Sequence, residues 1–218
     1  MKYLGPPCSG SKEGTTASRN RFGQYYRTRA IPVNPSTPQQ LTMRSRMSTN
    51  SAAWRVLTDT QRAGWESLGA QIQRTDALGQ TYTLNGFMAY CSVNNNRLDA
   101  GDAVLSDAPA IVTPGQLATV TITLTAVALS IAYTATPLPA ATRLFIFASP
   151  QKSAGRQFNG DYRLISVTAA AAASPHNLLA AYTARLGVPV VGQRIFFKLQ
   201  TYNAGFIQTP FAVSQLVA

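Results

Sequence analysis

The strict alternation of threonine with aliphatic residues over Thr119–Thr125 constrains the fold of this chain more than any other feature. Successive side chains of a β-strand point to opposite faces of the sheet, so the pattern predicts a strand with one buried face. Threonine and serine also interrupt the most apolar stretch, Leu117–Ala135, at nearly every second position. This stretch is therefore predicted to form strands and not a membrane span.

Five further segments after residue 108 have the composition of strands and are separated by turn-rich sequences. They are Ala128–Tyr133, Arg143–Ala148, Tyr162–Thr168, Arg194–Thr201 and Phe211–Val217. Short strands at this spacing predict that residues 108–218 form an antiparallel β-sandwich of the immunoglobulin or fibronectin type. A short helix over Asn177–Arg185 is expected to cross between the two sheets.

The preceding region begins with two predicted helices. Ser36 or Thr37 can cap a first helix that runs to about Val56. The sequence Thr58–Gln61 resembles a capping box and predicts a second helix that ends near Gln73. Each helix carries an apolar face at helical spacing, which is expected to be buried. The first face contains Leu41, Met43, Met47 and Trp54, and the second contains Trp65, Leu68 and Ile72.

A short strand is expected over Thr81–Leu84, and a third helix over Phe87–Leu98 should end near Gly101. The predicted fold class is therefore α+β. It consists of an extended N-terminal arm over residues 1–35, a small helical region over residues 36–107, and the sandwich over residues 108–218.

The N-terminal arm is predicted to be extended because glycine and proline recur at a density that opposes helix. The chain has a net charge of +11, and residues 1–50 hold eight Lys or Arg against one Glu. This balance of charge predicts a polyanionic partner: nucleic acid, an acidic protein surface or an anionic membrane.

Aromatic side chains lie among the arginines of the arm, which a solvated tail rarely needs. The residues expected to bind a partner are Arg19, Arg21, Phe22, Tyr25, Tyr26, Arg27 and Arg29. They fit nucleic acid, through phosphate contacts and base stacking, or a groove of another subunit that offers carboxylates and apolar pockets. The stiff segment Ala30–Pro35 favours a protein partner, because an extended segment can add a strand to a neighbouring sheet.

Residues for catalysis do not occur in recognisable patterns. The chain has one histidine, His176, and residues 108–218 hold one acidic residue, Asp161, so neither a catalytic triad nor a carboxylate pair is predicted there. Cys8 and Cys91 lack the spacing of metal ligands and are expected to be free thiols in a reducing cytoplasm. With no glycine-rich phosphate loop either, we predict no enzymatic activity, no metal and no cofactor.

Residues 10–40 resemble the start of a set of uncharacterised phage and prophage proteins. In these an SRNRxGxYxRxR arm precedes a PxNPxTPxQ segment, as it does here from Ser18 to Gln40. A W-x-x-L-T-x-x-Q-R-x-x-W segment follows, which is Trp54–Trp65 in this chain. The resemblance covers about residues 10–100 and implies a structural role in a virus particle.

We therefore expect a non-enzymatic structural protein of a bacteriophage virion, either a capsid-associated decoration protein or a minor structural subunit. Its arm would bind capsid or tail subunits, and the protein would form a homo-oligomer, assemble in the host cytoplasm and contact no membrane. One alternative is a particle protein that binds nucleic acid. Another is a carbohydrate-binding or adhesion module, with Tyr133, Phe158 or Tyr202 of the sandwich stacking on sugars.

Overall fold

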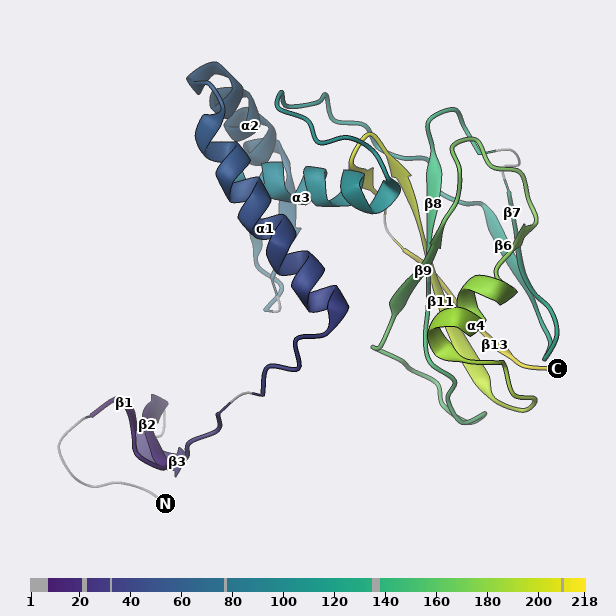
Figure 1. The fold of residues 1–218 in the computed structure, drawn as a ribbon, viewed down its shortest axis with the longest axis horizontal. Coiled ribbons are helices and arrows are strands. Elements are labelled where there is room, and N and C mark those ends of the chain that lie inside the picture. Colours follow the sequence, from purple (N-terminus) through teal and green to yellow (C-terminus); the bar gives the residue numbers. More distant parts are fainter. Residues whose placement is uncertain (1–7, 21–22, 32, 77, 135–137, 209) are drawn as a thin grey trace. The chain divides into compact units, whose positions relative to one another are not determined.

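The computed structural model describes residues 8–20, 23–31, 33–76, 78–134, 138–208 and 210–218 (Figure 1). The chain divides into two compact units, Met1–Arg44 and Ser45–Ala218. Among the described residues the fold is α+β, with four helices and several small antiparallel sheets, which confirms the predicted class. None of the described helices is long and apolar enough to span a bilayer.

The first unit contains an antiparallel sheet in which three strands follow one another. They are β1 (Gly10–Lys12), β2 (Thr15–Asn20) and β3 (Gly23–Thr28). The chain reverses at Glu13, which has a φ of 53°, and Gly23 at the start of β3 has a φ of 112°, which suits glycine. The amide of Arg29 donates to the carbonyl of Gly14 at 2.8 Å. This segment is therefore folded back on itself and is not the single extended arm that the sequence predicted.

Three helices lie close to their predicted positions. They are α1 (Pro38–Val56), α2 (Asp59–Gln71) and α3 (Gly86–Ala100). The capping box of α2 is confirmed, because the amide of Gln61 donates to Thr58 Oγ1 at 3.3 Å and the amide of Thr58 donates to Gln61 Oε1 at 3.0 Å. Gly101 ends α3 in the left-handed region, as expected.

The helices of the second unit share a core around Trp65, which is fully buried on α2. The rings of Trp65 and Trp54 both contact Tyr90 of α3, so both tryptophans belong to this core as expected. A hairpin of β4 (Gln73–Thr75) and β5 (Thr81–Thr83) follows α2.

The predicted burial of the first part of α1 is wrong. Leu41, Met43 and Met47 are exposed. The contacts of α1 with α3 lie further along the helix, where Arg46 pairs with Asp99 and Asn50 Nδ2 donates to Asn95 Oδ1. The apolar face of α1 therefore extends beyond the part of α1 that α3 covers.

Two antiparallel sheets complete the second unit (Figure 1). The first has the order β10-β7-β6, with β6 (Thr119–Leu124), β7 (Leu129–Thr134) and β10 (His176–Asn177). The second has the order β12-β11-β8-β9, with β13 also paired to β11. Its strands are β8 (Arg143–Ala148), β9 (Arg163–Val167), β11 (Arg194–Asn203), β12 (Phe206–Ile207) and β13 (Phe211–Leu216).

One hydrophobic core lies between these sheets and contains side chains from both. Ile122 and Ile131 of the first sheet meet Ile146 and Phe197 of the second, and all four are buried. Helix α4 (Leu179–Leu186) connects β10 to β11 and adds the buried Tyr182, which confirms the predicted helical crossover. The alternation over Thr119–Thr125 is confirmed as well, because Ile122 and Leu124 are buried while Thr121 and Thr123 are exposed.

The helical region is joined to the second sheet by a half-buried polar cluster. Asp102 accepts from the hydroxyl of Tyr202 at 2.6 Å and from Nη2 of Arg143 at 2.8 Å. Nearby, a Cβ on Gly205 would lie 2.5 Å from Cγ1 of Val93 on α3. These close contacts explain why helices and sheets form one compact unit.

Candidate functional site

The pairing of β2 with β3 divides the predicted contact residues between two faces of the N-terminal sheet. Directly opposed residues of an antiparallel pair project to the same face, and the faces alternate along each strand. The opposed pairs are Arg19 with Gln24, Ser18 with Tyr25, Ala17 with Tyr26, and Thr16 with Arg27. Arg19 and Tyr26 therefore share one face, while Tyr25 and Arg27 share the other.

Neither face of this sheet carries a fully buried side chain among the described residues of its unit. Among residues 8–37, every side chain that the structure describes is exposed or half-buried. A small sheet needs a hydrophobic face packed on something to be independently stable. The N-terminal sheet is therefore expected to gain stability when it binds a partner.

A small polar cluster occupies the face that carries Tyr26. Gln24 Nε2 donates to the carbonyl oxygen of Cys8 at 2.7 Å, and the amide of Cys8 donates to Gln24 Oε1 at 2.9 Å. The Cys8 thiol lies 3.1 Å from the Tyr26 hydroxyl. Gln24 carries no signal of this role in the sequence, because its partner lies 16 residues earlier in the chain. The cluster engages Tyr26 and lies on the face opposite to Tyr25 and Arg27.

The cations of the N-terminal sheet lack partners within the described part of the chain. Lys12, Arg19, Arg27 and Arg29 make no ion pair with any described residue. All four ion pairs found among those residues lie in the second unit instead. Unpaired guanidinium groups next to aromatic rings are well suited to bind carboxylates or phosphates.

Two of the predicted contact residues, Arg21 and Phe22, lie outside the described residues, as does Pro32 of the segment Ala30–Pro35. Within that segment the side chains of Ile31 and Val33 are 76% and 88% exposed. Large aliphatic side chains so exposed, and so near unpaired arginines, favour a contact with another protein.

Catalytic or metal-binding geometry is not found in the described residues. These ranges hold no group of three or more His, Cys, Asp or Glu side chains placed to bind a metal ion. His176 Nε2 lies 3.5 Å from Ser166 Oγ, at the edge of hydrogen-bonding distance. Both cysteines are free thiols, as predicted, and burial raises the pKa of Cys91.

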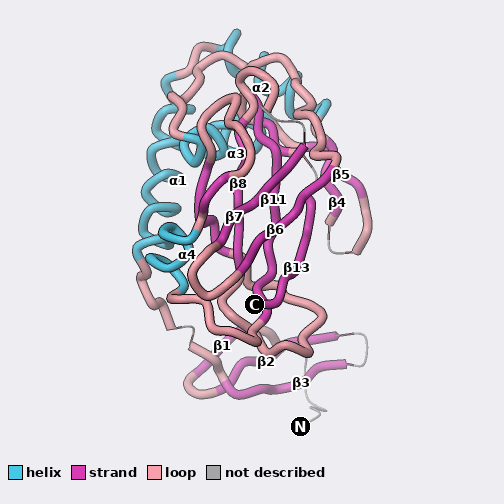
Figure 2. Tube along the Cα trace, turned by 90° about the vertical axis from the view of Figure 1, so that its right-hand side faces the viewer, coloured by secondary structure: helices cyan, strands magenta, loops and turns pink. Residues whose placement is uncertain are grey.

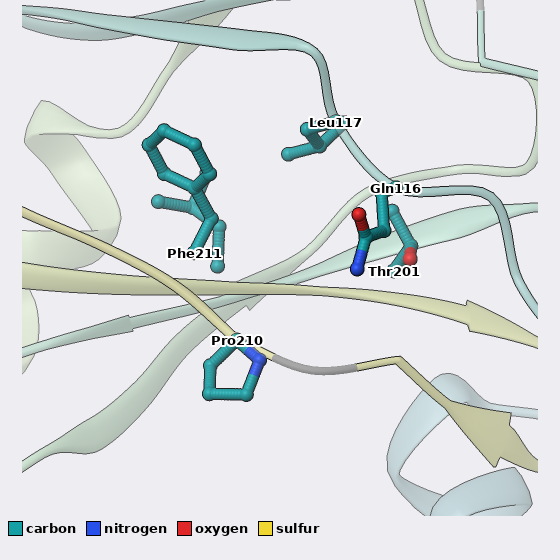
Figure 3. A pocket seen from close by; sticks show the side chains of 6 residues that line it. Gln116, Leu117, Thr201, Pro210 and Phe211 are labelled. Atoms are coloured by element: carbon teal, nitrogen blue, oxygen red, sulfur yellow. The ribbon is translucent and has the colours of Figure 1, made fainter.

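A pocket lies beside β11 and β13 (Figure 3). Its volume is about 100 Å³, which is small against the roughly 300–1,000 Å³ of ligand pockets. The lining residues are uncharged: Gln116, Leu117, Leu199, Thr201, Pro210 and Phe211. This shape and lining suit a solvent-filled gap better than a substrate site.

A sugar-binding role requires exposed aromatic rings, and only one of the three residues considered for it is exposed. Tyr133 and Tyr202 are buried, so their rings are not available to stack on a sugar. Phe158 is 77% exposed in a loop. A lone exposed phenylalanine is a poor platform for a glycan.

Comparison of the chain with known protein families, with curated proteins and with solved structures finds no match. The residues that most favour a particular function are the unpaired cations and aromatic side chains of the N-terminal sheet.

Proposed function

We propose that this protein is a non-enzymatic structural component of a bacteriophage virion, a capsid-associated decoration protein or a minor structural subunit. In this proposal the N-terminal unit binds neighbouring capsid or tail subunits, and the second unit is held at the particle by that contact. The observation that carries it is a basic, aromatic sheet with no fully buried side chain and cations that have no partner in the described chain.

Electrostatics favours an acidic partner surface. Arg19 and Arg27 project from opposite faces of the sheet, and each guanidinium can bind a carboxylate with two parallel hydrogen bonds. An interface that removes these groups from water must supply such partners, because an unpaired buried charge is strongly destabilising. The site therefore selects for acidic surfaces and against basic ones.

Apolar side chains would supply the rest of the binding energy. Tyr25 lies beside Arg27 on one face of the sheet, and Ile31 and Val33 follow within a few residues. Tyrosine and arginine are the side chains that most often dominate protein interfaces when they fill pockets of the partner. Ordering this segment against a subunit would also remove Ile31 and Val33 from water.

The same proposal includes an immunoglobulin-like sandwich over residues 108–218, and features of the second unit support it. Its two antiparallel sheets share a core, and the chain passes from β10 to β11 through α4. The orders β10-β7-β6 and β9-β8-β11-β13 fit the two layers of a fibronectin-type domain. A rigid module of this kind suits a protein displayed on a particle. The free thiols suit assembly in the host cytoplasm.

The test is to purify particles from the host that carries this gene and to measure the protein in them by quantitative mass spectrometry. We expect the wild-type protein at a fixed ratio to the major subunit. A variant with Arg19→Glu and Arg27→Glu should remain folded and be absent from particles. The matched control, Arg156→Glu in an exposed loop, should be incorporated like wild type. Particles that lack the wild-type protein would disprove the virion role.

Nucleic acid remains the alternative partner, because Tyr25 and Arg27 share a face on which a base could stack beside a phosphate contact. Binding to a single-stranded oligonucleotide would then weaken steeply with salt, with a log–log slope that scales with the number of phosphates contacted. Retention of an oligonucleotide at physiological salt, lost in the double variant, would favour this alternative over the subunit contact.

A further inference from the structure

One side of the second unit is formed by two sheet edges that carry no charge. Strand β6 is the edge of the first sheet and β13 is an edge of the second, and the two lie side by side (Figure 2). The amide of Ala218 donates to the carbonyl of Leu124 at 3.2 Å and ties the two edges together at one end. We call β6 and β13 together the uncharged side.

The sequence around these strands contains no Asp, Glu, Lys or Arg over residues 108–142 and 199–218. The charged residues after residue 107 lie on β8, β9, β11, α4 and the loops between them. They are Arg143, Lys152, Arg156, Asp161, Arg163, Arg185, Arg194 and Lys198. In a chain with a net charge of +11, such a separation sets the uncharged side apart from the rest of the unit.

The backbone of β6 presents unpaired groups at this side. The amide of Thr125 donates to the carbonyl of Ala128 in the ladder with β7, so by alternation the groups of Val120, Ile122 and Leu124 face away from β7. The bond from Ala218 to Leu124 confirms this direction. The N–H and C=O groups of Val120 and Ile122 have no partner there among the described residues.

The edge of β13 is open in the same way. The amide of Val217 donates to the carbonyl of Gln193, so the groups of Ala212, Ser214 and Leu216 face away from β11. Proteins that remain monomeric usually protect sheet edges with lysine, proline or a bulge. Neither β6 nor β13 contains a lysine or a proline, and Leu216 is exposed.

We propose that the uncharged side binds a second copy of this chain, with the open edges of β6 and β13 pairing across a two-fold axis. Self-association here is independent of what the N-terminal sheet binds. A two-fold contact needs a self-complementary surface. An antiparallel pair of β6 strands centred on Thr121 places Val120 opposite Ile122 of the copy and satisfies the four open backbone groups of each β6 edge.

The charges of the chain select this partner. Nucleic acid and acidic proteins find no cation on β6 or β13, and a basic protein finds no carboxylate there. A second copy presents the same uncharged strands, so a contact between two uncharged sides brings no like charges together.

The test is sedimentation equilibrium of the full chain over a wide range of concentration. We expect a monomer–dimer equilibrium for the wild-type chain. The double variant Thr121→Lys and Ser214→Lys puts a charge on each edge in both copies, and it should raise the dissociation constant of the dimer by about tenfold or more. Ala180→Lys, on the exposed part of α4, adds the same charge and should leave the dimer intact. A chain that is monomeric throughout, or edge variants that dimerise like the control, would overturn the proposal.

A second measurement guards against variants that fail to fold. In the wild-type protein, hydrogen exchange at the amides of Val120, Ile122, Ala212 and Ser214 should slow as the protein concentration rises. Unchanged exchange at these amides, under conditions where dimers form, would place the contact elsewhere. The double variant Arg19→Glu and Arg27→Glu should dimerise like wild type, and loss of its dimer would show that the N-terminal sheet is the contact.

Discussion

The bond between Tyr202 and Asp102 connects the helical region to the second sheet, and its removal tests how the second unit holds together. Tyr202→Phe deletes the hydroxyl that donates to Asp102 at 2.6 Å and keeps the ring, which stacks on Phe145 with centroids 5.1 Å apart. Asp102 retains its ion pair with Arg143 at 2.8 Å. The substitution therefore changes one polar contact in an otherwise intact cluster.

The expected loss follows from the geometry. A hydrogen bond to a charged group contributes about 1.5–3 kcal/mol when both partners are shielded from water. The side chain of Asp102 is 25% exposed, so water can replace part of what the hydroxyl supplied. We expect the free energy of unfolding to fall by about 1.5 kcal/mol, which for a unit of this size lowers Tm by about 3–6 °C.

Thermal and urea unfolding followed by circular dichroism would measure this change. Tyr162→Phe is the matched control, because its ring is half-buried near Lys198, and it should change stability by less than about 0.5 kcal/mol. A double-mutant cycle with Asp102→Ala, which removes the acceptor, should give a coupling energy of about 1 kcal/mol or more. Additive effects, or a Tyr202→Phe protein as stable as the control, would refute the connection.

Two further changes test the packing of the second unit. Gly205→Ala should destabilise the protein by more than about 1 kcal/mol, because Gly205 has a φ of 99° and a Cβ would overlap Val93, whereas Gly155→Ala should be nearly neutral in urea titrations. Burial raises the pKa of Tyr182 to about 12, so between pH 10 and 12 the unfolded chain ionises first and stability falls. Unfolding measured across this range should show a shallower fall in Tyr182→Phe.

Local signals in the sequence were sufficient for most elements of the second unit. The capping box at Thr58 and the alternation over Thr119–Thr125 depend on residues a few positions apart, and both are confirmed. The two-residue strands β10 and β12 were not predicted, because two residues carry no periodicity. Burial of α1 was predicted too far toward its start, because an apolar stripe does not reveal where the covering helix ends.

The candidate site was only partly visible in the sequence. Composition identified Arg19, Tyr25 and Arg27, but their division between two faces depends on the register of β2 with β3, which residues close together in the sequence do not reveal. The sheet itself was missed because neither face is buried, so its strands show no alternation of apolar and polar residues. A surface whose partner is another molecule leaves little trace in the pattern that reports a core.

The two proposed surfaces differ in charge, and this difference keeps their partners apart. The N-terminal sheet attracts acidic surfaces and repels its own copies, while the uncharged side has no charge to attract the partner of the sheet. Salt shortens the Debye length from about 10 Å at 0.1 M to about 3 Å at 1 M, so it weakens contacts between exposed charges. It does not weaken hydrogen bonds between sheet edges or the burial of apolar side chains to the same extent. High salt should therefore release the protein from particles as dimers, whereas release as monomers would mean that the two contacts depend on each other.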